Sequence, residues 1–130
     1  ERRWLHYDPP RMFRPKQRAM FEEPKLVVQR IRGRGAVRAA IDRSGIYLGH
    51  TCTIVQPRQS DLTLEVALRV LREPALLGLL RVERGRALDL YPRDVASLPV
   101  PTAWLEGHDV DVAPALGLRE DQVERLRTLA

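Results

Sequence analysis

The sequence predicts an α/β fold: a small mixed β-sheet with a flanking helical pair, an extended N-terminal arm and a C-terminal helix. Leu26 to Ile31 is a short, mostly apolar run, typical of a strand buried on both faces. Ile46 to Val55 alternates between two faces and is rich in β-branched residues, which indicates a second strand. Between them, residues 36–41 form either a strand or a helical turn, and residues 42–45 form a turn. From Asp61 the apolar spacing becomes helical.

The length of 130 residues fits one hydrophobic core with appendages. We divide the chain into an arm or connector over 1–23, a central domain over 24–101, and a polar loop with a C-terminal helix over 102–130. The arm contains prolines and no sustained period, so we expect it to lie extended on the core. Aromatics interleaved with arginine also suit stacking on unpaired bases, but packing on the domain is the commoner use. The expected anchors are Trp4, Tyr7, Phe13 and Phe21.

The strongest helix signal follows the second strand. Leu64, Leu68 and Leu71 have the spacing of one helix face. Ser60 or Asp61 is in position to cap the first turn of this helix.

The rest of the chain is interrupted by proline and glycine. Pro74 ends the first helix, and residues 75–82 continue as a second helix packed beside it. Residues 87–90 are expected to form a closing strand, and residues 91–101 a proline-bounded exit. Residues 119–129 form an amphipathic helix. Its predicted apolar seam consists of Val123, Leu126 and Leu129.

The chain is basic, with a net charge of +5 and a pI near 10.1. Nearly all of its cations are arginines, whose planar guanidinium fork suits phosphate oxygens and guanine edges. Codon usage in a GC-rich genome explains an arginine excess equally well. The single cysteine excludes an internal disulfide and fits a cytoplasmic location. We find no apolar run of about 20 residues and no leader, so no membrane partner is expected. A start at Glu1 rather than Met suggests a piece of a longer protein.

No catalytic or metal site is predicted within this chain. The histidines, His6, His50 and His108, have neither ligand spacing nor a carboxylate partner. Cys52 has no His or Cys companion, so we interpret it as a small hydrophobe rather than a nucleophile. An enzyme acting alone is therefore the least favoured class.

The basic turn after the first strand is the candidate binding site. Six cations surround it and face one anion, Asp42, while Gly33 and Gly35 allow close backbone approach. A solvated charged turn is the ordinary interpretation of such a run. The arginines, however, alternate with glycine at the end of an apolar strand that can hold them rigidly, which favours a polyanion. Arg30, projecting from the strand, is the leading candidate. The cations are Lys25, Arg30, Arg32, Arg34, Arg38 and Arg43.

The order of these segments resembles the TaqI-like C-terminal specificity domain of adenine-N6 DNA methyltransferases and fused restriction-modification enzymes. The resemblance covers about residues 20–101. It rests on Phe21 to Ile31 (FEEPKLVVQRI), Gly45 to Val55 (GIYLGHTCTIV), the leucine-rich helix Leu62 to Leu71, and Leu98 to Pro101 (LPVP). The helix end and the basic insert at Gly33 to Ala36 depart from the family pattern.

The resemblance implies a target-recognition domain that docks on DNA, while a separate N-terminal catalytic domain of the parent protein binds S-adenosylmethionine. It adds Thr51 and Thr53 to the expected DNA-binding residues. This chain would hold no cofactor and would not itself be the methyltransferase.

We therefore predict a specificity domain that recognises double-stranded DNA for an N6-adenine methyltransferase or restriction-modification protein. The alternative is a protein-protein interaction module that docks a partner or catalytic domain without specific DNA readout. If the basic residues lie together on one concave surface, DNA binding is favoured; if they are scattered, the protein-docking alternative is favoured. The DNA target, a fused nuclease, DNA binding by the fragment alone and the oligomeric state do not follow from the sequence.

Overall fold

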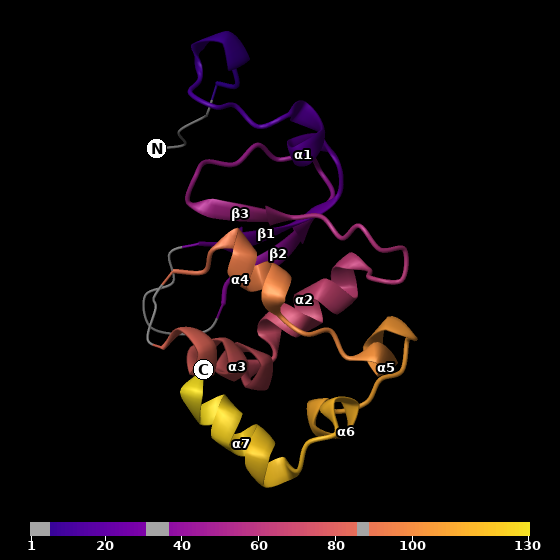
Figure 1. The fold of residues 1–130 in the computed structure, drawn as a ribbon. Coiled ribbons are helices and arrows are strands. Elements are labelled where there is room, and N and C mark those ends of the chain that lie inside the picture. Colours follow the sequence, from indigo (N-terminus) through magenta and orange to yellow (C-terminus); the bar gives the residue numbers. More distant parts are fainter. Residues whose placement is uncertain (1–5, 31–36, 86–88) are drawn as a thin grey trace.

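The computed structural model describes residues 6–30, 37–85 and 89–130 (Figure 1). The first elements are the 3-10 helix η1 (Pro9–Arg11), helix α1 (Arg18–Glu22), and strands β1 (Lys25–Gln29), β2 (Ala39–Asp42) and β3 (Cys52–Val55). The remaining elements are α2 (Leu64–Arg72), α3 (Pro74–Arg84), α4 (Pro92–Ser97), α5 (Thr102–Leu105), α6 (Val112–Leu116) and α7 (Glu120–Leu129). The predicted α/β class is confirmed. Among the described residues, no helix has the length and apolar character needed to cross a membrane.

The sheet has the strand order β2-β1-β3, with β1 in the centre. Val27 of β1 lies opposite Ala40 of β2 and Ile54 of β3, and both pairs are antiparallel. The sheet is thus antiparallel throughout its described strands, whereas a mixed sheet was expected. The connection from Gln29 to Ala39 is too short for the crossover that a parallel pair requires.

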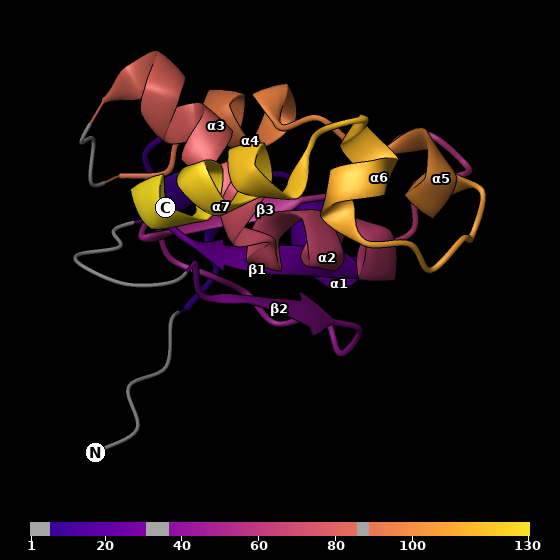
Figure 2. The same ribbon diagram turned by 90° about the horizontal axis from the view of Figure 1, so that it is seen from below.

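One face of the sheet is covered by helices. Leu26 and Val28 project from β1 into the core and are fully buried. Helix α2 contacts β1 and β2, α4 contacts β3, and α3 and α7 pack together further from the sheet (Figures 1 and 2). The helical pair α2 and α3 is present as predicted, with Glu73 accepting a hydrogen bond from Ala75 N at their junction. This arrangement leaves part of the opposite sheet face open.

The N-terminal arm covers the sheet face away from the helices, at the end where β1 begins. It is partly helical, in η1 and α1, rather than fully extended as expected. Phe21 is buried and stacks on Tyr47 with ring centroids 4.6 Å apart, and Tyr7 packs against both rings. Phe13 is 89% exposed and is not an anchor. Trp4 lies outside the described residues.

The second predicted strand, expected over Ile46 to Val55, is shorter in the structure. Only Cys52–Val55 is a strand, because the segment before it is held by other contacts. Asp42 accepts hydrogen bonds from Ser44 N and Ile46 N, and Gly45 adopts φ +78°. Tyr47 then joins the aromatic residues of the arm and donates a hydrogen bond to Glu22. Of this segment, Tyr47 packs against the arm, while Ile46 and residues 49–51 are exposed.

The helix boundaries after β3 also differ from the expectation. Thr63, rather than Ser60 or Asp61, caps α2, since its hydroxyl accepts a hydrogen bond from Val66 N. The exit segment contains α4, which begins at Pro92, a residue suited to the first helical position. Residues 102–118, expected as a polar loop, contain α5 and α6. These short helices are stabilised by buried contacts, such as those of Trp104.

The predicted closing strand at 87–90 and the apolar seam of the C-terminal helix are each met in part. Residues 87–88 of the proposed closing strand lie outside the described residues, while Asp89 forms an isolated bridge and Leu90 N donates to Arg30 O at 2.9 Å. Helix α7 buries Val123 fully and Leu126 partly. Leu129 is 49% exposed, so the seam ends one turn earlier than expected.

Candidate nucleic-acid interface

Three of the predicted contact residues meet at one end of the sheet. Arg30 follows β1, Arg38 precedes β2 and Thr51 precedes β3. Because β1 is antiparallel to both neighbours, its end lies beside their beginnings. Arg30 N donates to Thr51 O and Gln29 N donates to Arg38 O, both at 2.9 Å. We call this end, formed by Gln29, Arg30, Arg38, Thr51 and Cys52, the basic end of the sheet.

The Arg30 side chain lies on an aromatic ring. Its guanidinium carbon is 4.7 Å from the ring centroid of Tyr91, and those of Arg84 and Arg93 are 5.5 and 5.8 Å from the same centroid. A ring face attracts cations and holds a guanidinium in a defined plane. Tyr91 is itself fixed by the start of α4, where its backbone N–H donates to Asp94 Oδ2 at 2.7 Å.

This arginine cluster is only partly neutralised. Asp94, 3% exposed, forms an ion pair with Arg84 and lies 3.9 Å from Arg93. Arg30 has no ion pair with a described carboxylate, and its buried Nε has no hydrogen-bond partner among the described residues. Leaving a buried donor without a partner is costly.

Two hollows flank the basic end of the sheet and share Cys52. One, of about 300 Å³, is lined by side chains that include Lys16, Arg30 and His50. The other, of about 850 Å³, lies on the open sheet face and is lined by side chains that include Gln29, Arg38, Thr51 and Arg72. Each of the two hollows beside Cys52 is therefore lined by cationic side chains.

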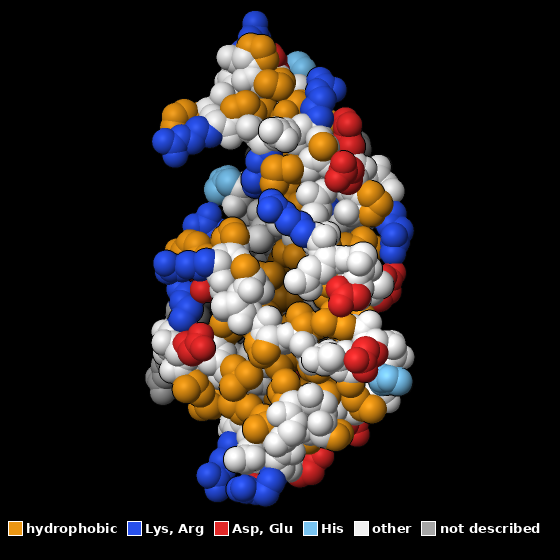
Figure 3. Space-filling view, turned by 45° about the vertical axis from the view of Figure 1, so that its right-hand side comes forward, with side chains coloured by type: hydrophobic (Ala, Val, Ile, Leu, Met, Phe, Trp, Pro, Cys, Tyr) orange, Lys and Arg blue, Asp and Glu red, His pale blue; other side chains and the backbone are white. Residues whose placement is uncertain are grey.

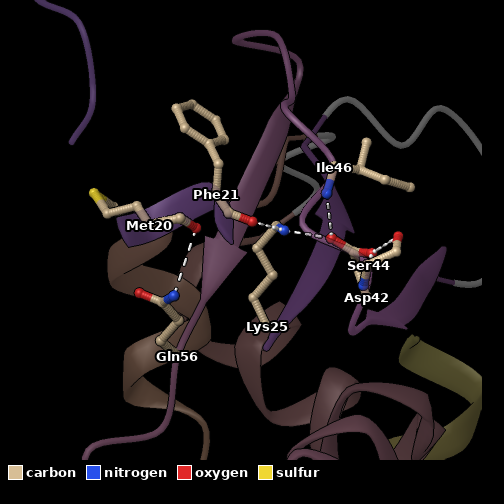
Figure 4. Close-up of polar contacts among 7 residues, drawn as sticks. All are labelled: Met20, Phe21, Lys25, Asp42, Ser44, Ile46 and Gln56. Atoms are coloured by element: carbon tan, nitrogen blue, oxygen red, sulfur yellow. Dashed lines mark hydrogen bonds and ion pairs between the residues drawn. The ribbon is translucent and has the colours of Figure 1, made fainter. Parts of the chain in front are cut away.

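Lys25 does not belong to this surface. It is fully buried at the opposite end of β1, where its ammonium donates hydrogen bonds to Phe21 O and Asp42 Oδ2 (Figure 4). Burial raises the pKa of Asp42, but hydrogen bonds from Lys25, Ser44 and Ile46 outweigh burial and hold the pKa below its ordinary value. The prediction of a DNA contact from Lys25 is therefore wrong for this structure, because its charge is used to join the arm to two strands.

The other predicted residues are distributed as follows. Thr53 is 5% exposed and faces the interior, so it offers little contact surface. Arg43 lies at the opposite end of the sheet and pairs with Glu65 at 2.5 Å. A hydrogen bond from the Glu65 backbone, together with the one from Arg43, holds the pKa of Glu65 below its ordinary value. Arg32 and Arg34 lie outside the described residues.

The sequence interpretation missed Tyr91, Arg84 and Arg93. A tyrosine between arginines, in Arg84 to Arg93, was a usable signal for a cation-binding ring. It was overlooked because these residues are about 60 positions from Arg30 in the sequence. The hydrogen bond from Leu90 N to Arg30 O and the contact of Arg30 with the Tyr91 ring bring the two segments together.

Comparisons of the chain with protein-family models, with curated proteins and with solved structures found no match. Within the described ranges, no three His, Cys, Asp or Glu residues form a group that could hold a metal ion. The arrangement at the basic end of the sheet is suited to binding an extended anion.

Proposed function

We propose that this chain is a DNA-binding target-recognition domain that docks on double-stranded DNA through the basic end of its sheet. The proposal rests on one observation: Arg30, Arg38 and Thr51 flank the adjoining ends of three strands, and the Arg30 side chain belongs to the arginine cluster on Tyr91. Arginines held on a rigid sheet and ring can contact phosphates with little loss of side-chain freedom. Phosphate contacts supply most of the affinity of such proteins for DNA.

The resemblance of residues 20–101 to the TaqI-like specificity domain extends the proposal to the parent protein. That protein would be an N6-adenine methyltransferase or a fused restriction-modification enzyme in the cytoplasm. Its catalytic domain would bind S-adenosylmethionine, and this chain would supply recognition. Arg32 and Arg34 remain proposed contacts, because they connect Arg30 to the segment that contains Arg38.

Titration of the chain with random-sequence duplex DNA tests the proposal. We expect fluorescence anisotropy to show that affinity falls about 40-fold or more between about 50 and 200 mM salt, the change for about three phosphate contacts. Arg38→Ala and Arg93→Ala should each reduce the slope of log affinity against log salt by about one unit. Both side chains are exposed, so folding should be retained.

Arg43→Ala is the matched control, since it removes the same charge at the opposite end of the sheet. It should leave the salt slope unchanged. Equal effects of all three substitutions would contradict an interface at the basic end and indicate attraction by net charge alone.

The alternative function, a protein-docking module, is favoured by one observation. A hollow of about 480 Å³ lies between β3 and helices α2 and α4, and its lining includes Ile54, Val55, Leu71, Val95 and Leu98. Figure 3 shows hydrophobic side chains gathered in the middle of one face, with Lys and Arg mostly toward its edges. Absence of DNA binding at about 50 mM salt would favour this alternative.

A further inference from the structure

We propose that Gln29 is a specificity-determining residue that contacts a base edge, and that its preferred base is adenine in the major groove. The inference rests on the proposed function, because it assigns sequence readout to one side chain of the same surface. The arginines around it would hold phosphates, which position the protein without specifying sequence.

Gln29 is held in the sheet by pairing on both sides. It lies in the central strand, opposite Cys52 of β3, and its backbone N–H donates to Arg38 O on the other side. Both edges of its backbone are thus held by neighbouring chain segments. A side chain on such a strand is aimed more reproducibly than one on a loop.

The Gln29 side chain is half-buried, yet its amide makes no hydrogen bond to any described residue. It lines the hollow of about 850 Å³ on the open sheet face. Two nearby positions that line the same hollow, Val27 and Ala40, carry small apolar groups. Within the described part of the chain, the donor and acceptor of the amide are thus free to meet a bound molecule.

This combination matches the major-groove edge of an A·T pair. A glutamine amide can donate to adenine N7 and accept from the N6 amino group, and thymine adds a methyl group that favours apolar contact. Val27 and Ala40 offer that apolar surface beside the amide. Arg38 and Arg72 line the same hollow and would attract the flanking phosphates.

Selection from a randomised duplex library tests the inference. Wild-type protein should enrich a motif, and Gln29→Met, which keeps the side-chain length and lacks the amide, should lose preference at one A·T position by about 5- to 150-fold. Its affinity for random duplex should stay within about twofold. Gln29→Glu keeps the shape but only accepts hydrogen bonds, so its preference at that position should move toward cytosine. Thermal denaturation checks that both variants are folded.

The outcomes separate this inference from the function on which it rests. If wild-type protein binds duplexes with the expected salt dependence but selects no motif, the inference is overturned and the proposed DNA contact stands. If both variants select the wild-type motif with equal discrimination, Gln29 is not the reader. If no duplex binds at about 50 mM salt, the proposed function fails and the inference fails with it.

Discussion

At the scale of single residues, two cations that are five positions apart have opposite roles. Lys25 is fully buried and paired with Asp42, whereas Arg30 lies on Tyr91 and its Nε has no hydrogen-bond partner in the described part of the chain. A buried ammonium needs a charge partner and hydrogen bonds to offset its lost hydration. The number of cations in the sequence therefore overstates the number available to bind a partner, since Lys25 is used to stabilise the fold.

Lys25→Met is expected to lower the free energy of unfolding by about 3–5 kcal/mol near neutral pH, because it leaves the Asp42 carboxylate buried without its partner. Urea denaturation measures this loss. Arg43→Met is the control, because the pair of Arg43 with Glu65 is exposed and screened by solvent, so its loss should change the free energy of unfolding far less.

The same pair predicts how stability depends on pH. The pKa of Asp42 is lowered by folding, so its contribution is present above the unfolded value of about 3.9 and is lost as pH falls toward the folded value. The stability difference between wild type and Lys25→Met should therefore narrow as pH falls from about 7 to about 2. A difference that stays constant over this range would contradict the assigned role of Asp42.

At the scale of elements, a close helix contact joins the C-terminal helix to the core. Gly78 of α3 faces Leu126 of α7, and a Cβ built on Gly78 would lie 2.0 Å from Leu126 O. Neither helix can shift easily, because Leu76 and Val123 are fully buried beside this contact. Glycine is required here for close approach, at the expense of helix propensity.

Gly78→Ala is accordingly expected to lower the free energy of unfolding by about 2 kcal/mol or more, since the steric overlap outweighs the gain of about 1 kcal/mol in helix propensity. Chemical denaturation measures the change. Gly49→Ala is the control, because no atom lies within 4 Å of its added Cβ. Stabilisation by Gly78→Ala would mean that α7 does not pack on α3 as described.

At the scale of the whole molecule, the position of Cys52 allows the interface to be mapped. It is the only cysteine in the chain, and it lines both hollows beside the basic end of the sheet. Bound DNA should therefore slow its reaction with a maleimide by about tenfold or more at low salt, and the protection should disappear at high salt. Mass spectrometry of the labelled chain measures the rate.

A second position provides the comparison. In a Cys52→Ser background, Glu65→Cys introduces an exposed thiol on α2, near the end of the sheet where Arg43 lies. Its labelling should be unaffected by DNA. Protection of this position with none at Cys52 would move the interface away from the basic end of the sheet.

The α/β class, the first strand and the α2–α3 pair follow from the sequence alone, because periodicity and local composition report on short segments. The arginine-rich turn at 32–36 lies outside the described residues and stays a prediction. The alternation at 46–51 was misleading, because Tyr47 packs on Tyr7 and Phe21 of the arm and the strand begins only at Cys52. Which cations are paired and which face solvent can be seen only in the tertiary structure. It buried Lys25 and brought Tyr91 to Arg30, because pairing and burial depend on distances between segments far apart in the chain.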